Sequence, residues 1–473
     1  MTLRNETLEA RIDYASRRLY VSASTATALA PFEGTAGESA AGQVLEGALS
    51  AANAAALRQT FPNLRPAPIG RNRVAVGTGD RIGLATCGHA RAFQKFGDGV
   101  VPVFAQQSIR EMDRLGRDVQ SVLDDATFGC VAAGWTGPVG ADCDHIKSTE
   151  GIDRGLSAGF TMFTLDPGDY VADIRPGITQ AQIDGLPWQD LEDNFDAFRA
   201  RYVGRSLDLN GQEIVIGEDD IYGAAVKYGR CIVEARRLYV HLMEQASYEV
   251  EVEIAVDETA FVTSFVEHFY LATELRRLGV DWVSFAPRYA DGFEKGVEYL
   301  GDLTILRDNL LGHKAVADAA GGYKMSLHSG SDKFSIYSTA VDATDQLIHL
   351  KTSGTSYLCA LEVVARHDGQ LLEEIWRVSR ESFVAARNSY QVSADVSKTP
   401  LTLTGVDLPE LVAAFDSRQI LHVGYGDALS SLDMHGGTLG MRLDAVLREN
   451  HADYSSVLEG HLGRHIKPFR PGL

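Results

Sequence analysis

Short segments rich in β-branched residues alternate with helical patterns from Val74 onward, and this alternation restricts the fold more than any other feature. The segments that we expect to be strands are VPVF, SVLDD, GFTMFTL, VEVEIAV, DWVSFAP, YKMSLH, QLIHLKT and QILHVGY. Strands that alternate with helices predict a parallel sheet, because the helices supply the crossovers between neighbouring strands. This many repeats in 473 residues favours an α/β fold of the (β/α)8 TIM-barrel type.

The first part of the chain and one internal segment do not follow this alternation. Residues 1–70 are rich in Ala, Gly, Ser and Thr, and we expect an N-terminal cap segment with helices around Leu8–Arg18 and Gly42–Thr60. Residues 71–473 would form the barrel and end in C-terminal helices. Within them, residues 176–220 carry polar turns and a hairpin signal, LNGQEIVI, which predicts an insertion or lid.

The charge balance restricts the partners of the protein. The sequence has 64 acidic and 44 basic residues, a formal net charge of -20, and no Lys/Arg run. Such a chain repels nucleic acid and anionic membranes, and no apolar run approaches the roughly 18 residues needed to cross a bilayer. We therefore expect a small-molecule partner and neither nucleic acid nor membrane. The oligomeric state stays open, a homo-oligomer included.

The cysteines indicate the compartment. There are five, an odd number, widely spaced and without a CxxC pair. This pattern is typical of reduced thiols and not of a disulfide framework, so we expect a cytoplasmic protein.

The segment YKMSLHSGSDK places polar groups on one face of an expected strand and in the turn after it. Lys324, Ser326 and His328 share one face, because side chains alternate along a strand. The following turn contains Ser329, Gly330, Ser331, Asp332 and Lys333, whose backbone N–H groups, hydroxyls and ammonium suit a bound anion. The segment has the features of an active-site rim.

Other expected strands also end in histidine, carboxylate or lysine. The residues are Asp144 and His145 in GADCDHIK, Asp257 and Glu258 in VDET, and His349 and Lys351 in LIHLKT. Strand ends converge at the carboxyl mouth of a barrel, where imidazoles and a carboxylate could bind Zn²⁺ or a similar divalent ion. Each histidine could instead be a hydrogen-bonded structural residue, but three on separate strands favour a site.

Further polar residues follow other strands. Arg288 and Lys295 could bind a carboxylate, or could form ion pairs with the nearby acidic residues. Gln106 and Gln107 could orient sugar hydroxyls or cap the following helix. GTGDRIG does not match the glycine spacing of a dinucleotide-binding loop, so we expect no nucleotide cofactor.

A string of motifs resembles the tagaturonate epimerases of bacterial hexuronate catabolism. In chain order, the motifs are GTGDRIG, FAQQSIRE, LDDATFG, GADCDHIK, GFTMFTLDP, VDET, FEKG, YKMSLHSGSDKFS, HLKTSGTSYL, SYQVSADVSK and RQILHVGYG. They run from Gly77 to Gly426, roughly three quarters of the chain.

The resemblance implies a carbohydrate epimerase that interconverts D-tagaturonate and D-fructuronate with a divalent metal ion of the Zn, Mn, Co or Ni class. The inverted carbon lies β to the ketone and its proton is not acidic, so retro-aldol cleavage, rotation of the aldehyde and re-addition are implied. The implied metal ligands are His145, His328, His349 and a carboxylate, Glu258 or its rival Asp257. The implied catalytic groups are Asp144 or Asp257 as base and Lys351 beside the oxyanions. The implied substrate-binding residues are Gln107, Arg288, Lys324, Ser329, Asp332 and Lys333.

Other functions agree with the same residues. A metal-dependent aldolase or lyase would use the same first half-reaction and release its fragments. An epimerase acting on neutral ketohexoses would differ only in the walls of the pocket. Epimerisation through a bound NAD is disfavoured because the dinucleotide fingerprint is missing. A sugar-acid binding protein without catalysis is the remaining class.

Overall fold

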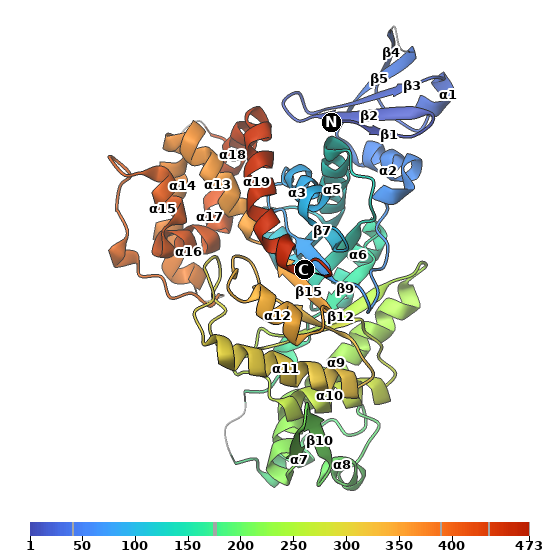
Figure 1. Ribbon diagram of the computed structural model, residues 1–473, viewed down its shortest axis with the longest axis vertical. Coiled ribbons are helices and arrows are strands. Elements are labelled where there is room, and N and C mark those ends of the chain that lie inside the picture. Colours follow the sequence, from blue (N-terminus) through green and yellow to red (C-terminus); the bar gives the residue numbers. More distant parts are fainter. Residues whose placement is uncertain (40–41, 174–176, 388–389, 434–435, 473) are drawn as a thin grey trace.

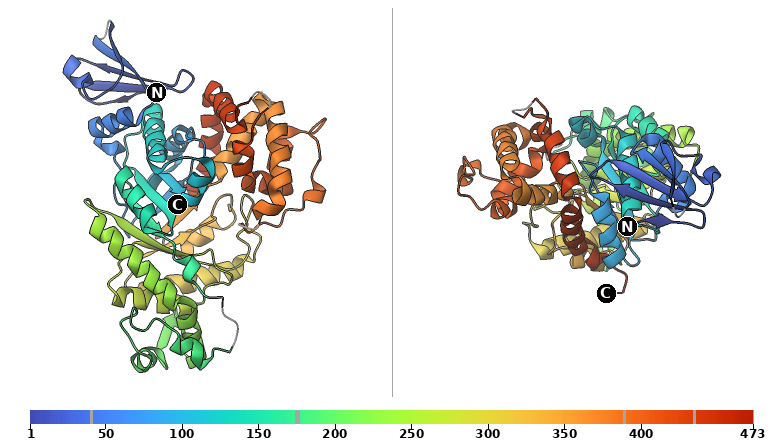
Figure 2. Two further views of the ribbon diagram at one scale, coloured as in Figure 1. Left: turned by 180° about the vertical axis from the view of Figure 1, so that it is seen from behind. Right: turned by 90° about the horizontal axis from the view of Figure 1, so that it is seen from above.

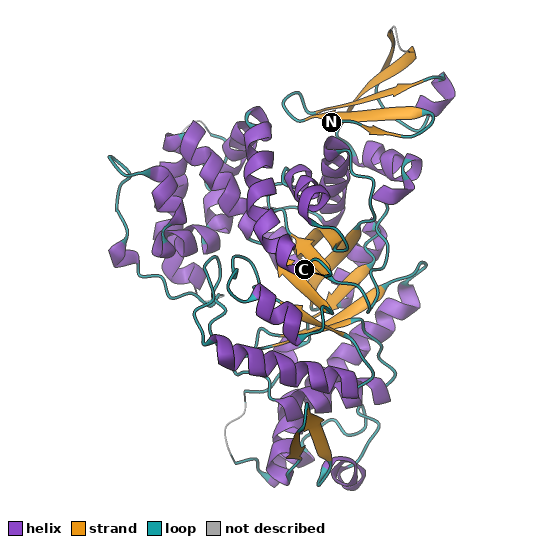
Figure 3. Ribbon diagram, in the orientation of Figure 1, coloured by secondary structure: helices purple, strands orange, loops and turns teal. Residues whose placement is uncertain are grey.

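The computed structural model describes residues 1–39, 42–173, 177–387, 390–433 and 436–472. Pro176, where the expected insertion begins, and Ser389, in the SYQVSADVSK motif, lie outside the described residues. The centre of the fold is a closed barrel of parallel strands (Figures 1 and 3). Its strands are β6 (Ala75–Thr78), β7 (Val101–Ser108), β8 (Gly140–Ile146), β9 (Met162–Leu165), β12 (Glu251–Val256), β13 (Ser284–Pro287), β14 (Lys324–Leu327) and β15 (Ile348–Thr352). The barrel closes through pairing of β15 with β6, and the predicted (β/α)8 fold is confirmed.

Helices follow the strands and cover the outside of the barrel. They are α3 (Thr86–Phe96), α4 (Ile109–Leu115), α5 (Val119–Ala133), α6 (Thr149–Ala158), α9 (Glu218–Gln245), α10 (Phe265–Arg277), α11 (Leu303–Ala319), α12 (Tyr337–Ala343) and α13 (Thr355–His367). On β8 the alternation is visible: Cys143 faces α6, where it packs against Gly155, while Asp142 and Asp144 face the interior.

The N-terminal residues form an antiparallel sheet in the order β1-β2-β3-β5-β4. Its elements are β1 (Leu3–Arg4), β2 (Leu8–Asp13), β3 (Arg18–Ala23), α1 (Ala26–Leu29), β4 (Thr35–Ser39) and β5 (Gly42–Ala48), followed by α2 (Ala51–Thr60) and η1 (Pro62–Leu64). The expected helix at Leu8–Arg18 was wrong, because its apolar residues are buried with period two, as a strand requires. The second expected helix begins only after Ser50, whose hydroxyl accepts the Asn53 N–H and caps α2.

A group of short elements lies between β9 and α9 in the chain, and those of them that Figure 1 labels lie at its lower end. It comprises η2 (Gly168–Tyr170), α7 (Gln180–Asp184), α8 (Phe195–Tyr202), β10 (Ser206–Leu209) and β11 (Gln212–Val215). The predicted hairpin is present, and Asn210 and Gly211 connect its strands with positive φ of 57° and 91°. The described residues of this segment line neither of the two cavities at the barrel mouth.

Helices of the C-terminal part form a layer beside the barrel (Figure 2). They are α14 (Gly369–Ala386), η4 (Val396–Lys398), α15 (Leu408–Ala413), α16 (Phe415–Val423), α17 (Tyr425–Ser430), α18 (Leu439–Glu449), α19 (His451–Ile466) and η5 (Lys467–Phe469). QILHVGY and SVLDD were expected as strands, but the first forms the end of α16 and the start of α17, and the second belongs to α5. Both segments are buried around most of the helix, so their short apolar runs do not show the helical period.

All five cysteines are buried and unpaired, as the sequence predicts. Among the described helices, none combines the length and the apolar character that crossing a membrane requires.

Candidate active site

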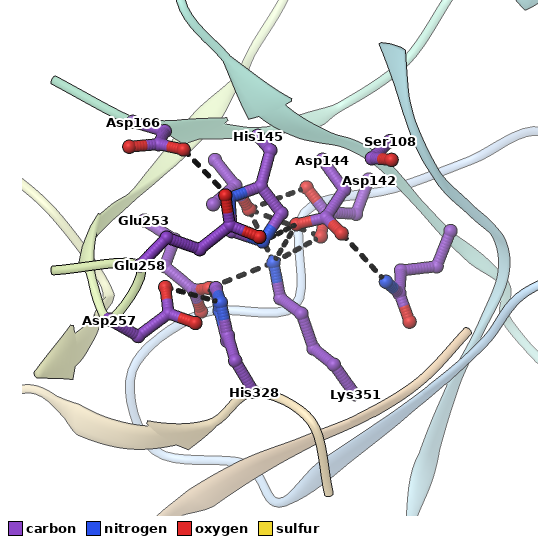
Figure 4. Close-up of polar contacts among 12 residues, drawn as sticks. Ser108, Asp142, Asp144, His145, Asp166, Glu253, Asp257, Glu258, His328 and Lys351 are labelled. Carbon is purple, nitrogen blue, oxygen red and sulfur yellow. Dashed lines mark hydrogen bonds and ion pairs between the residues drawn. The ribbon is translucent and has the colours of Figure 1, made fainter. Parts of the chain in front are cut away.

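The carboxyl end of the barrel holds a cluster of charged side chains, drawn in Figure 4. Lys351, on β15, is at its centre and is 4% exposed. Its Nζ lies 2.8 Å from Asp142 Oδ2, 2.7 Å from Asp144 Oδ1 and 2.8 Å from Glu253 Oε1. It also donates to Thr164 Oγ1 at 2.6 Å. One buried ammonium therefore neutralises part of the charge of three buried carboxyl groups.

The three carboxyl groups respond differently to this environment. Burial raises the pKa of Asp142, and Asp144 and Glu253 add to the shift against the effect of Lys351, so that the pKa is about 6. Burial also acts on Asp144, but Lys351, His145 and His328 outweigh it and lower the pKa of Asp144 below its ordinary value. Asp144 is therefore a carboxylate at neutral pH.

Asp144 and His145 both line the same cavity although they are neighbours on β8. A regular strand would point them to opposite faces. The pairing of β8 with β9 shifts between Cys143 and Ile146, and His145 has a positive φ of 51°. This bulge turns the imidazole into the mouth beside Asp144.

Asp166, after β9, fixes the His145 ring, because its Oδ2 lies 2.9 Å from His145 Nδ1. Burial lowers the pKa of His145, but Asp144 and Asp166 raise it by more, to about 10. The ring is thus oriented by one carboxylate and faces a second.

His328 follows β14 and is held between two carboxylates. Its Nε2 lies 2.6 Å from Glu253 Oε1 and its Nδ1 lies 3.0 Å from Asp257 Oδ1. Burial lowers the pKa of His328, but Asp257 raises it by more, so that the pKa is about 9. The rings of His328 and His145 meet edge to face with centroids 5.0 Å apart.

His145, Asp257 and His328 form the group that best suits a metal ion. One potential ligand atom from each lies within 4.8 Å of the others. Two imidazoles and a carboxylate suit Zn²⁺ and similar divalent ions, and three protein ligands leave positions for a substrate. The donor set present here therefore fits the metal that the resemblance implies.

Two other predicted ligands are placed differently. Glu258 accepts two hydrogen bonds from Arg110, at 2.7 and 3.1 Å, although it also forms an alternative group with His145 and Asp166. His349 is fully buried, with Nδ1 3.3 Å from Glu253 Oε2, and burial lowers its pKa to about 4. The neutral His349 ring therefore supports Glu253, which in turn contacts His328.

Sequence reasoning missed Glu253 and Asp166. Glu253 connects His328, His349 and Lys351, and it also accepts a hydrogen bond from Ser284 at 2.5 Å. The sequence contained a pattern that could have identified Glu253, since Glu251 and Glu253 are two residues apart in a strand that is otherwise apolar. Two acidic residues on one face of a buried strand indicate a polar barrel interior.

Two neighbouring cavities open at the barrel mouth. Both are lined by Glu258, Lys295, His328, Ser329 and Tyr390. The first extends inward to Asp144, His145 and Lys351. The second, of about 320 Å³, extends outward past Arg288 and is large enough for a small ligand.

Some predicted substrate-binding residues lie at these cavities and some do not. Ser329 and Arg288 line them, but Gln107 binds the Asp80 N–H and the Glu111 side chain, and its neighbour Gln106 lines the inner cavity instead. Lys324, at the start of β14, is fully buried four residues before His328, and burial lowers its pKa to about 8.

Asp332 and Lys333 hold the loop after β14 in place. Asp332 lies 2.7 Å from His461 Nε2 and 3.1 Å from Arg418 Nη2, and its N–H donates to His465 Nε2 at 2.9 Å. Asp332, His461 and His465 are close enough to hold a metal ion. However, the His465 lone pair already accepts a backbone N–H and Arg418 brings a permanent positive charge, so this group serves as an anchor.

Asp332→Ala is expected to lower the free energy of unfolding by about 3 kcal/mol, because it leaves Arg418 without its buried carboxylate partner. Urea unfolding measures this loss. Asp453→Ala is the control, since Asp453 pairs with Arg366 at the surface and should cost under about 1 kcal/mol. Equal effects of the two substitutions would remove the anchor role.

Comparison with known proteins decides the family. Residues 12–469 match the tagaturonate epimerase family. The chain belongs to this family. It is 36% identical over 416 residues to the tagaturonate/fructuronate epimerase of Thermotoga maritima, covering 88% of this chain and 84% of that protein.

Solved structures agree with this assignment. A crystal structure of the fructuronate-tagaturonate epimerase of Cohnella laeviribosi with one bound glycerol has a TM-score of 0.89 and 30% identity, covering 99% of this chain and 95% of that one. The native crystal structure of the same protein has a TM-score of 0.89 and 29% identity with the same coverage. As a member of the tagaturonate epimerase family, the protein is an enzyme of the isomerase class.

Proposed function

We propose that this enzyme interconverts D-tagaturonate and D-fructuronate by retro-aldol cleavage and re-addition, with a divalent cation held by His145, Asp257 and His328. The observation that carries the proposal is that these three residues lie close enough to hold one ion, and that His145 and His328 line the same cavity as the Lys351–Asp144 pair. The names of the similar proteins supply the two sugar acids.

A divalent cation of the Zn, Mn, Co or Ni class would polarise the ketone and stabilise the enediolate as a Lewis acid. Asp144 accepts the proton of the hydroxyl on the carbon β to the ketone. The electrons of that O–H bond form the aldehyde, and the pair of the broken C–C bond enters the enediolate. After the aldehyde turns, the same electron movements in reverse remake the bond with the opposite configuration, and the proton returns to oxygen.

Lys351 has two roles in this scheme. Its charge keeps Asp144 ionised before the proton transfer, and its ammonium lies beside the negative charge that develops during cleavage. Burial excludes water from the pair, which strengthens both effects. The five buried free thiols fit a reducing compartment, so we place the reaction in the cytoplasm.

Chelation is expected to abolish epimerisation, and restoring one metal at a time is expected to recover it. NMR of the reaction mixture should then show both keto acids and no accumulated three-carbon fragments. Full activity after chelation would exclude the metal. Steady accumulation of two three-carbon fragments from tagaturonate would identify an aldolase instead.

A further inference from the structure

The cations around the two cavities are nearly all paired with acidic groups. Arg81 lies 2.5 Å from Glu111, Arg110 binds Glu258 through two nitrogens, and Lys351 contacts three carboxyl groups. These cations already have partners within the protein, so an anionic ligand would have to compete for them.

Arg288 is also engaged. It donates to the carbonyl of Thr259, and its Nη2 lies 3.2 Å from Asp291 Oδ1. The guanidinium lines the outer cavity, but it would have to leave these partners to bind a substrate carboxylate through both nitrogens.

Lys295 differs from all of them. It lines both cavities, and within the described part of the chain its Nζ has neither an ion pair nor a hydrogen bond. Its charge reaches the site, since Lys295 is among the groups that lower the pKa of Glu258, after His145 and Arg110. An unpaired ammonium beside a cavity is available to an anion.

The loop that carries Lys295 is fixed by its backbone. The Lys295 N–H donates to Gln391 O at 3.1 Å, and the carbonyl accepts from Gln419 Nε2 at 3.3 Å. On either side, the carbonyls of Glu294 and Val297 each accept from Lys333 Nζ at 2.7 Å. Little backbone freedom remains to be lost when a ligand binds.

We propose that Lys295 receives the carboxylate of the sugar-acid substrate and gives the enzyme its preference for uronates over neutral ketohexoses. This inference rests on the proposed function, because it takes the substrate to be a six-carbon keto acid. A neutral ketohexose carries a hydroxymethyl group where the uronate carries its carboxylate. It would leave the Lys295 charge uncompensated, and this difference discriminates between the two substrates.

Lys295→Met removes the charge and keeps most of the side-chain length. We expect KM for D-tagaturonate to rise about 10-fold to 100-fold, the range for loss of a charge-assisted hydrogen bond, with a smaller change in kcat. Lys295→Arg should recover most of the affinity. Lys95→Met is the matched control, because Lys95 lies on the remote helix α3, where it pairs with Glu459, and its loss should leave KM unchanged.

Competition assays separate charge from shape. D-gluconate, an unreactive six-carbon acid, should inhibit the Lys295→Met variant about 10-fold more weakly than the wild type, whereas weak inhibition by neutral D-sorbitol should not change. An unchanged KM and gluconate inhibition, or a KM increase confined to Arg288→Met, would overturn the assignment. If the wild type fails to convert D-tagaturonate, the proposed function fails, and the comparison of gluconate with sorbitol still tests Lys295.

Discussion

Asp144→Asn is expected to reduce kcat by a factor of about 100 to 10,000, the range for loss of a general base. The amide occupies nearly the same volume but cannot accept the proton of the substrate hydroxyl. Lys351 keeps Asp142 and Glu253 as partners, so the cluster should survive the change. NMR measurement of epimerisation together with metal analysis of the purified variant tests this expectation.

The matched variant is His328→Ala, which is expected to lose both the bound metal and the activity. The two variants should differ because His328 belongs to the group suited to a metal ion and Asp144 does not. Asp144 Oδ1 lies 4.0 Å from His145 Nε2, so its substitution leaves the three ligands in place. Normal turnover by Asp144→Asn would remove Asp144 from the base role. Asp257 would then be the candidate, provided that Asp257→Asn retains the metal and loses turnover.

The sequence predicted the barrel because its strands are short, β-branched and separated by helical patterns. It predicted secondary structure less well where the spacing of apolar residues does not reveal whether a segment is a helix or a strand. The helix α16 is buried on nearly every side, so even its polar residues Gln419 and His422 are buried and QILHVGY has no exposed face that would mark a helical turn. In β2, by contrast, Leu8, Ala10 and Ile12 alternate with more polar residues, as in a strand. The prediction of a helix there did not take this alternation into account.

Residue chemistry located the candidate site, but it could not assign partners to each group. Asp332 and Lys333 lie in a loop whose backbone N–H groups, hydroxyls and ammonium were expected to suit a bound anion. The structure gives Asp332 a partner on α19, 129 residues later in the chain, and gives Lys333 the carbonyls of Glu294 and Val297. Such pairings depend on how distant helices pack, which local patterns do not encode.

The Asp144–His145 pair shows the same limit at the level of the backbone. Two adjacent residues on a strand reach one cavity only if the chain leaves the regular strand geometry between them. The positive φ of His145 and the shifted register with β9 provide this change. The residue types indicated base and ligand chemistry, whereas the bulge that brings both into the mouth appears only in the structure.

Lys351→Met is expected to abolish turnover and to lower the free energy of unfolding at neutral pH by about 3–5 kcal/mol, the usual cost of breaking a buried ion pair. The substitution leaves Asp142, Asp144 and Glu253 buried without their shared cation. Thermal unfolding at several pH values and epimerisation measured by NMR test both parts. Asp142→Asn combined with Lys351→Met removes one acidic group with the ammonium, and it should recover part of the lost stability.

The pH dependence of this variant follows from Asp142. Its pKa of about 6 in the folded protein lies above the ordinary value of 3.8, so folding favours the protonated form. The stability that this group contributes is complete below about pH 3.8 and is lost as the pH rises through about 6. Without Lys351 the pKa of Asp142 rises further. The loss of stability relative to the wild type should therefore be smaller at pH 5 than at pH 8. Equal destabilisation at both pH values would mean that lost packing, and not uncompensated carboxylate charge, causes the effect.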